Sequence, residues 1–134
     1  MPATTFPEYV QYMTDLLNQV VAMGETVLSA FQVDQRSAVR GLIAGILQFG
    51  DGSELYFREY IDMTLTEPKI MYAYHYQDAD RNLIFRYDNA APKPVLPQPA
   101  HKHTPLGIEA SPVPTLAEVL DLMCGRHKRL STKA

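Results

Sequence analysis

The sequence contains a single cysteine and no long apolar run, and these two absences narrow the classes of protein to which it can belong. Cys124 alone can form neither an intrachain disulfide nor a cysteine-based zinc site, so a reducing cytoplasm is the expected compartment. The most apolar stretches, residues 20–22 and 41–47, are far too short to cross a bilayer. No basic segment precedes an apolar run near the N-terminus, which argues against a signal peptide. We therefore expect neither a membrane protein nor a disulfide-rich secreted one.

Positive residues are scarce in the first part of the chain, and negative residues are scarce in the last part. Residues 1–80 hold 4 Lys/Arg and 11 Asp/Glu, whereas residues 81–134 hold 8 Lys/Arg, 4 Asp/Glu and three of the four histidines. A positive C-terminal part on an acidic body suits a phosphate-bearing ligand or an acidic partner protein, and it is equally consistent with an unevenly charged, solvated surface. At 134 residues, the chain has the size of one domain with a core of its own.

The first regular element that the sequence predicts is an amphipathic helix over residues 7–24. Its apolar side chains recur at the i, i+3, i+4, i+7 spacing, which places them on one helical face. A threonine, a proline and a glutamate near residue 5 form a typical helix start, and Gly24 is a typical end. This helix is expected to bury one face against whatever follows it.

A sheet is expected between residues 27 and 89. Apolar and polar residues alternate there in short runs separated by turn signals, and Asp51 with Gly52 has the character of a tight hairpin. Short connections between neighbouring runs favour an antiparallel meander. The expected strands cover residues 27–33, 42–49, 55–63, 70–77 and 82–87.

Proline dominates residues 90–114, which hold seven of the ten prolines. Because proline lacks the N–H that a sheet ladder needs, this segment is expected to be an extended surface strap or an edge. A short helix is expected at 115–124, capped by Thr115 and ended by Gly125, before a frayed basic tail at 125–134. The predicted fold is therefore α+β in a single domain: a small antiparallel meander of four to five strands, a helix at each end and a proline-rich strap.

Polar side chains that could carry chemistry gather on the predicted strands. If neighbouring strands align, His75 and Arg86 face each other, Asp88 lies beside Arg86, and either Glu59 or Arg58 lies one strand further on. A base, an acid and a cation on one face are what cleavage of a phosphodiester requires: the base takes the 2′-OH proton, the acid protonates the leaving oxygen, and the cation stabilises the phosphorane. Each residue also has a plainer interpretation, as a solvent-facing strand residue, a structural histidine or a local ion pair.

Two further sets of residues leave alternatives open. His101 and His103 point to the same side if the backbone is extended. They could act as acid or base, contact phosphate, or form half of a metal site that Asp88 or Glu59 completes. They could equally be part of a solvated strap without a chemical role. The strand tyrosines could stack RNA bases, although such side chains more often pack in a core.

Four stretches in this order, DGSELYFREY, YAYHYQD, FRYDNA and HKH, resemble the TumE family of predicted toxin components of toxin–antitoxin modules. The resemblance covers about residues 41–103, and the run from Arg86 to Ala90 is its most specific element. The sequence departs from the family pattern at Ala91-Pro92-Lys93 and at Ala100, where histidines are expected. The positions that match the family's marked residues are Asp51, Gly52, Glu59, His75, Arg86, Asp88, Asn89, His101 and His103.

This resemblance implies a growth-inhibiting toxin of a type II module, neutralised by a protein antitoxin that is encoded beside it. We expect a metal-independent endoribonuclease without a cofactor, in which Glu59 or His75 is the base and His101 or His103 is the acid. Asp88 would orient a histidine or the arginine. The expected catalytic residues are Glu59, His75, Arg86, Asp88, His101 and His103, and the expected substrate-binding residues are Arg58, Asn89, Lys93 and Lys102.

Two other functions remain open at this point. The first is a module without chemistry that binds a partner protein or a second copy of itself through the proline-rich strap. It predicts that the polar residues tolerate alanine while deletion of the strap abolishes complex formation. The second is a metal-dependent hydrolase built on His101, His103 and a carboxylate, which sensitivity to a chelator would reveal.

Overall fold

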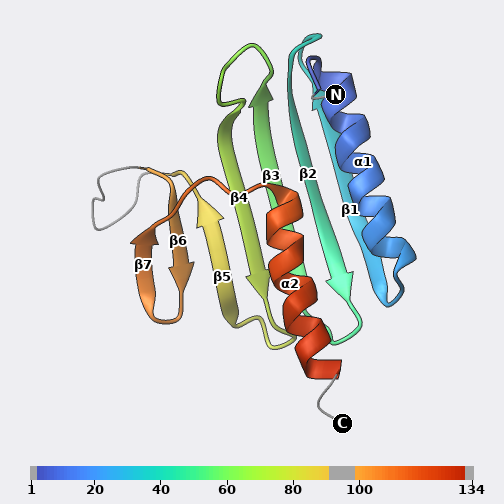
Figure 1. Cartoon of the computed structure of the whole chain (residues 1–134), viewed down its shortest axis with the longest axis vertical. Coiled ribbons are helices and arrows are strands. Elements are labelled where there is room, and N and C mark those ends of the chain that lie inside the picture. The colour runs from blue at the N-terminus through green and yellow to red at the C-terminus, as the bar shows by residue number, and fades with distance from the viewer. Residues whose placement is uncertain (1–2, 91–98, 132–134) are drawn as a thin grey trace.

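Seven strands form one antiparallel sheet in which each strand pairs with the next along the chain. The computed structural model describes residues 3–90 and 99–131, with a helix before the sheet and another after it (Figure 1). The helices are α1, Phe6–Ala22, and α2, Leu116–Ser131. The strands are β1 Thr26–Gln35, β2 Arg40–Phe49, β3 Glu54–Asp62, β4 Lys69–Gln77, β5 Leu83–Asp88, β6 His101–Thr104 and β7 Gly107–Ala110.

Local signals in the sequence explain where these elements begin and turn. The Thr5 side chain caps α1 by accepting a hydrogen bond from the Glu8 backbone N–H. At the start of α2, Thr115 and Glu118 bond reciprocally, each side chain accepting from the other's backbone N–H at 3.1 Å. Gly52 adopts a φ of 87° in the turn between β2 and β3, a conformation that glycine reaches without strain. The predicted caps and the predicted hairpin are thus confirmed.

The structure corrects the predicted number of strands. Five strands were expected at most, yet β6 and β7 add two more within the proline-rich segment 90–114. That segment was expected to be a surface strap or an edge. It does provide the edge strand β7, but also the inner strand β6. The positions of the prolines explain this outcome. Pro99, Pro105 and Pro112 all fall outside β6 and β7, so every residue of these two strands keeps a backbone N–H that can pair. Four residues per strand are too few for alternation to be recognised in the sequence.

The C-terminal helix is also longer than the sequence indicates. Gly125 was expected to end it, but α2 continues to Ser131 through the segment expected to be a frayed basic tail. A single glycine is tolerated inside a helix at a cost of about 1 kcal/mol relative to alanine, so its presence does not force an end.

Both helices contribute to a hydrophobic core that lies on one face of the sheet. The core contains Phe6, Met13 and Leu17 from α1 and Leu116 and Val119 from α2, together with inward-facing strand residues. Figure 1 shows α2 crossing in front of the central strands while α1 lies along β1. The opposite face, which we call the open face, carries the other half of the strand residues. Within the described residues, no helix is long and apolar enough to span a membrane.

Candidate catalytic site on the open face

Antiparallel pairing aligns two rows of side chains across the open face. Residues in each row stand directly opposite one another on successive strands, and six residues that the sequence singles out for chemistry fall within these rows. The rows, read from β1 to β7, are Gln32, Ala44, Arg58, Ala73, Asp88, His101 and Ala110, and then Ala30, Ile46, Tyr56, His75, Arg86, His103 and Ile108. The expected pairing of His75 with Arg86 is confirmed.

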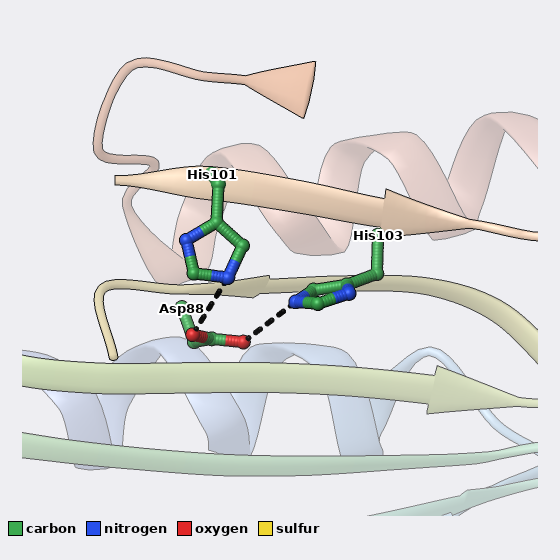
Figure 2. A group of neighbouring side chains, drawn as sticks. All are labelled: Asp88, His101 and His103. Atoms are coloured by element: carbon green, nitrogen blue, oxygen red, sulfur yellow. Dashed lines mark ion pairs between the residues drawn. The ribbon is translucent and has the colours of Figure 1, made fainter. Parts of the chain in front are cut away.

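Asp88 is the centre of a polar cluster in these rows. Its Oδ2 accepts a hydrogen bond from Arg86 Nε at 2.9 Å and lies 3.4 Å from His103 Nε2. Its Oδ1 lies 3.0 Å from His101 Nε2, and both histidines are seen to converge on the carboxylate in Figure 2. The Ala90 backbone N–H donates to the same Oδ1 at 3.0 Å. These partners compensate for the lost hydration of a carboxylate that is only 6% exposed.

The two histidines beside Asp88 differ in what they can reach. His101 is buried, and its Nδ1 donates to the Pro99 carbonyl oxygen at 2.5 Å while its Nε2 faces Asp88. Both of its nitrogens are therefore engaged, and the ring is held in place. The ring of His103 packs against it at 4.6 Å between centroids, but its side chain is 27% exposed. Of the two, His103 is the one that can contact a ligand.

His75 extends the cluster onto the next strand. Its Nδ1 lies 3.4 Å from an Nη of Arg86, and because a guanidinium only donates, Nδ1 must accept. Its Nε2 then carries the hydrogen and donates to the Gln77 side-chain oxygen at 3.2 Å. Burial, with a smaller contribution from the cationic Arg86, lowers the pKa of His75 below its ordinary value. His75 is thus neutral near pH 7 and has a lone pair directed at the arginine.

A groove of about 410 Å³ runs along the open face from the cluster toward β1. His75 and Arg86 line its end nearest the cluster, and Arg58 and Tyr56 stand further along it. Its floor is made of small or apolar side chains, among them Ala30, Ala44, Ile46 and Ala73. The groove therefore leads from a flat apolar floor to a group of titratable side chains.

Asp88, His101 and His103 are also a set that could hold a metal ion. Their ligand atoms all lie within 4.8 Å of one another. The distances of 3.0 and 3.4 Å between the carboxylate oxygens and the imidazole nitrogens are close to the spacing of about 3.3 Å between neighbouring ligands of a tetrahedral zinc ion. Two imidazoles and one carboxylate suit zinc and other transition metals. Arg86 donates to the same carboxylate and would compete with such an ion.

Glu59 does not belong to this cluster, although the sequence left it as one of the possible neighbours of His75. It lies on the opposite face of the sheet and is fully buried in the core. The hydroxyls of Tyr9 and Tyr74 both donate to its carboxylate, and Lys69 Nζ lies 3.6 Å away. Burial, and then the charge of Glu59, raise the pKa of both tyrosines far above the ordinary value, so they remain donors. This network holds α1 on the sheet.

Two of the residues expected to bind substrate, Asn89 and Lys102, lie elsewhere. Lys102 is paired with Tyr87 on the helix-covered face, and its Nζ lies 5.2 Å from the centroid of the Tyr87 ring. Asn89 accepts from the Tyr72 backbone N–H and donates to the Ile70 carbonyl oxygen, so its amide continues the pairing of β5 with β4 beyond the last strand residue. Lys93 falls outside the described residues.

The groove floor is the part of the site that sequence reasoning missed. Ala30, Ala44 and Ala73 carry no chemistry and attract no attention singly. What distinguishes them is their position: Ala44 and Ala73 flank Arg58 on the neighbouring strands, so the two side chains directly across from it are small. That relation requires the register, which the sequence does not provide.

The fold and the cluster together define a class of small α+β protein in which one open sheet face carries a histidine–arginine–aspartate site. Within this class, the chain belongs to the TumE toxin family, because the family model described as Toxin TumE matches residues 11–130. The resemblance noted over about residues 41–103 is thereby confirmed and extended into both helices. No curated protein and no solved structure shows significant similarity to the chain.

Proposed function

We propose that this protein is the toxin of a type II toxin–antitoxin module and that it cleaves RNA in the cytoplasm without a metal ion. Its family supports the toxin part. The observation that carries the chemistry is the side-by-side placement of a neutral His75, the cation Arg86 and the partly exposed His103 on three successive strands. These are the base, the charge stabiliser and the acid that cleavage through the ribose 2′-OH requires.

In this proposal Arg86 changes partner when RNA binds. Its contact with His75 Nδ1 is long, at 3.4 Å, and so is weak and easily exchanged for a phosphate oxygen. That exchange frees the Nδ1 lone pair, which accepts the proton of the 2′-OH as the 2′-oxygen attacks phosphorus. His103 gives a proton to the leaving 5′-oxygen, and a 2′,3′-cyclic phosphate and a free 5′-OH result. Asp88 keeps both Arg86 and His103 in position throughout.

A second candidate function is a metal-dependent phosphodiester hydrolase. It is favoured by the proximity of Asp88, His101 and His103, whose ligand atoms could share one ion. A zinc ion in that position would activate a water molecule instead of the 2′-OH. The products would differ, since hydrolysis by water leaves no cyclic phosphate.

Growth and RNA integrity after inducible expression test the proposed function. Wild type is compared with His75→Ala and Arg86→Ala, and with Arg36→Ala as a control, because Arg36 is an exposed arginine that pairs with Asp34. We expect growth arrest and new RNA fragments from wild type and Arg36→Ala, and neither from the two cluster variants, with all four proteins soluble and folded. Growth arrest by both cluster variants would contradict the site.

The purified protein distinguishes the two candidate chemistries. Cleavage that persists after dialysis against a chelator and yields cyclic phosphate ends supports the metal-independent reaction. Cleavage that stops, and that returns with added zinc, supports the hydrolase. Wild type that neither arrests growth nor cleaves RNA would direct attention to binding of a partner protein instead.

A further inference from the structure

Beyond the reaction itself, the groove on the open face has properties that point to a particular form of substrate. Tyr56 stands at its edge, 39% exposed, with its ring edge-on to that of His75 at 6.3 Å between centroids. A flat aromatic side chain beside a floor of alanines suits the face of a nucleobase. The volume of about 410 Å³ lies in the range of pockets that hold small ligands.

The charge in the groove suits a nucleic acid better than a protein segment. Arg58 lines the groove and is exposed, and its side chain has no hydrogen bond or ion pair with any of the described residues. Its neighbours on the adjacent strands are Ala44 and Ala73, so its guanidinium is free to bind an anion. Arg86 stands two strands away and two residues along the strand direction, which places the two cations roughly 12 Å apart at the backbone. Two arginines and an aromatic ring along one groove match a phosphate backbone with a base between its phosphates.

We infer that the groove binds one nucleotide of single-stranded RNA next to the bond that is cleaved, with its base against Tyr56 and its outer phosphate on Arg58. The inference rests on the proposed function, since Arg86 and His103 take the scissile phosphate. A base can reach Tyr56 only when it is unpaired and unstacked, so the substrate is a single strand or a loop and not a duplex. The RNA crosses the strands from β5 toward β1.

Binding of a short fluorescein-labelled single strand with 2′-O-methyl riboses tests the inference apart from catalysis, because such RNA lacks the attacking hydroxyl. The variants are Tyr56→Ala, Arg58→Ala and Ala73→Leu, which fills the groove, and the matched control is again Arg36→Ala. Circular dichroism confirms that each variant is folded. Fluorescence anisotropy then gives Kd at several salt concentrations.

We expect wild type and Arg36→Ala to bind the single strand and to bind a duplex of the same sequence more weakly. Tyr56→Ala should weaken binding about tenfold, as loss of one stacked base does. Arg58→Ala should weaken it and reduce the slope of log K against log salt by about 0.7, the value for one phosphate contact on a single strand. Ala73→Leu should weaken binding without changing that slope.

The failures of the two proposals are distinguishable. Groove variants that bind the strand like wild type overturn the inference, even if wild type cleaves RNA. Variants that bind RNA normally but no longer bind the antitoxin assign the groove to that protein and also overturn it. A wild type that binds the strand through Tyr56 and Arg58 but cleaves no RNA supports the inference and overturns the proposed function.

Discussion

His75 and Arg86 stand directly opposite each other on β4 and β5, and the lone pair of His75 Nδ1 faces a guanidinium N–H at 3.4 Å. Because the group that His75 contacts is a guanidinium and not a carboxylate, this contact does not hold the histidine in its charged form. Arg86 also donates to Asp88, which links the neutral histidine to the two on β6. The open face therefore contains histidines in two different electrostatic settings, as acid–base catalysis requires.

The first prediction concerns the acid limb of the pH profile. The pKa of His75 is lowered, chiefly by burial and further by Arg86 and His103, with the Gln77 hydrogen bond acting in the opposite direction. A base with a lowered pKa loses activity only when the pH falls below that lowered value. The quantity to measure is kcat/KM for RNA cleavage between about pH 5 and 8. We expect it to stay level as the pH falls through the ordinary histidine pKa of about 6.5, and to decline only below the lowered pKa of His75.

Gln77→Ala provides the control for this assignment. Its side-chain oxygen stabilises the protonated ring, so its removal should move the acid limb to still lower pH. An acid limb that stays fixed in Gln77→Ala would show that a different group is the base.

The second prediction separates His101 from His103. His103→Ala should reduce cleavage by about 10²- to 10⁴-fold, as loss of a general acid does, with little change in stability because the ring is partly exposed. His101→Ala should lower the free energy of unfolding by about 1–3 kcal/mol, since the buried Asp88 and Pro99 oxygens lose a partner. Urea unfolding and a cleavage assay on the same preparations measure both effects. Equal losses of stability in the two variants would contradict this division.

Much of the fold could be predicted because it is specified locally. The caps at Thr5 and Thr115 and the turn at Gly52 each depend on residues within a few positions of one another. The two short strands β6 and β7 could not be predicted, since four residues give no periodic signal and the prolines around them argue for irregular structure. Short-range rules therefore succeeded where a segment is long or carries its own turn chemistry.

The site shows the same limit at longer range. Alternation placed His75, Arg86 and Asp88 on definite faces of their strands, and the register then brought them together. Alternation also grouped Glu59 with Leu55 and Ile61, which are core residues, so its burial was present in the pattern. What the sequence did not reveal was that the core would satisfy a carboxylate with two tyrosines and a lysine from distant segments.

The third prediction is that lysine cannot replace Arg86. The guanidinium uses Nε for Asp88 and an Nη for His75, whereas an ammonium group has no such fork. Arg86→Lys should keep the charge beside Asp88 and the stability. We nevertheless expect it to lose about 10²- to 10³-fold in the cleavage rate, the loss also expected of Arg86→Ala. Single-turnover cleavage of a short RNA measures the loss. Activity close to wild type in Arg86→Lys would reduce Arg86 to a source of positive charge.

The last prediction assigns Glu59 to stability and not to catalysis. Its carboxylate is fully buried, and its charge opposes the burial that lowers the pKa of Lys69. Its removal leaves the ammonium group of Lys69 without a counter-charge and two tyrosine hydroxyls without their acceptor. Glu59→Ala should lower the free energy of unfolding by about 3–5 kcal/mol. Glu59→Gln, which keeps an acceptor of the same shape, should lower it less. Because the sheet separates Glu59 from His75, Glu59→Gln protein that remains folded should cleave RNA at the wild-type rate. A stable but inactive Glu59→Gln protein would instead make Glu59 part of the catalytic site.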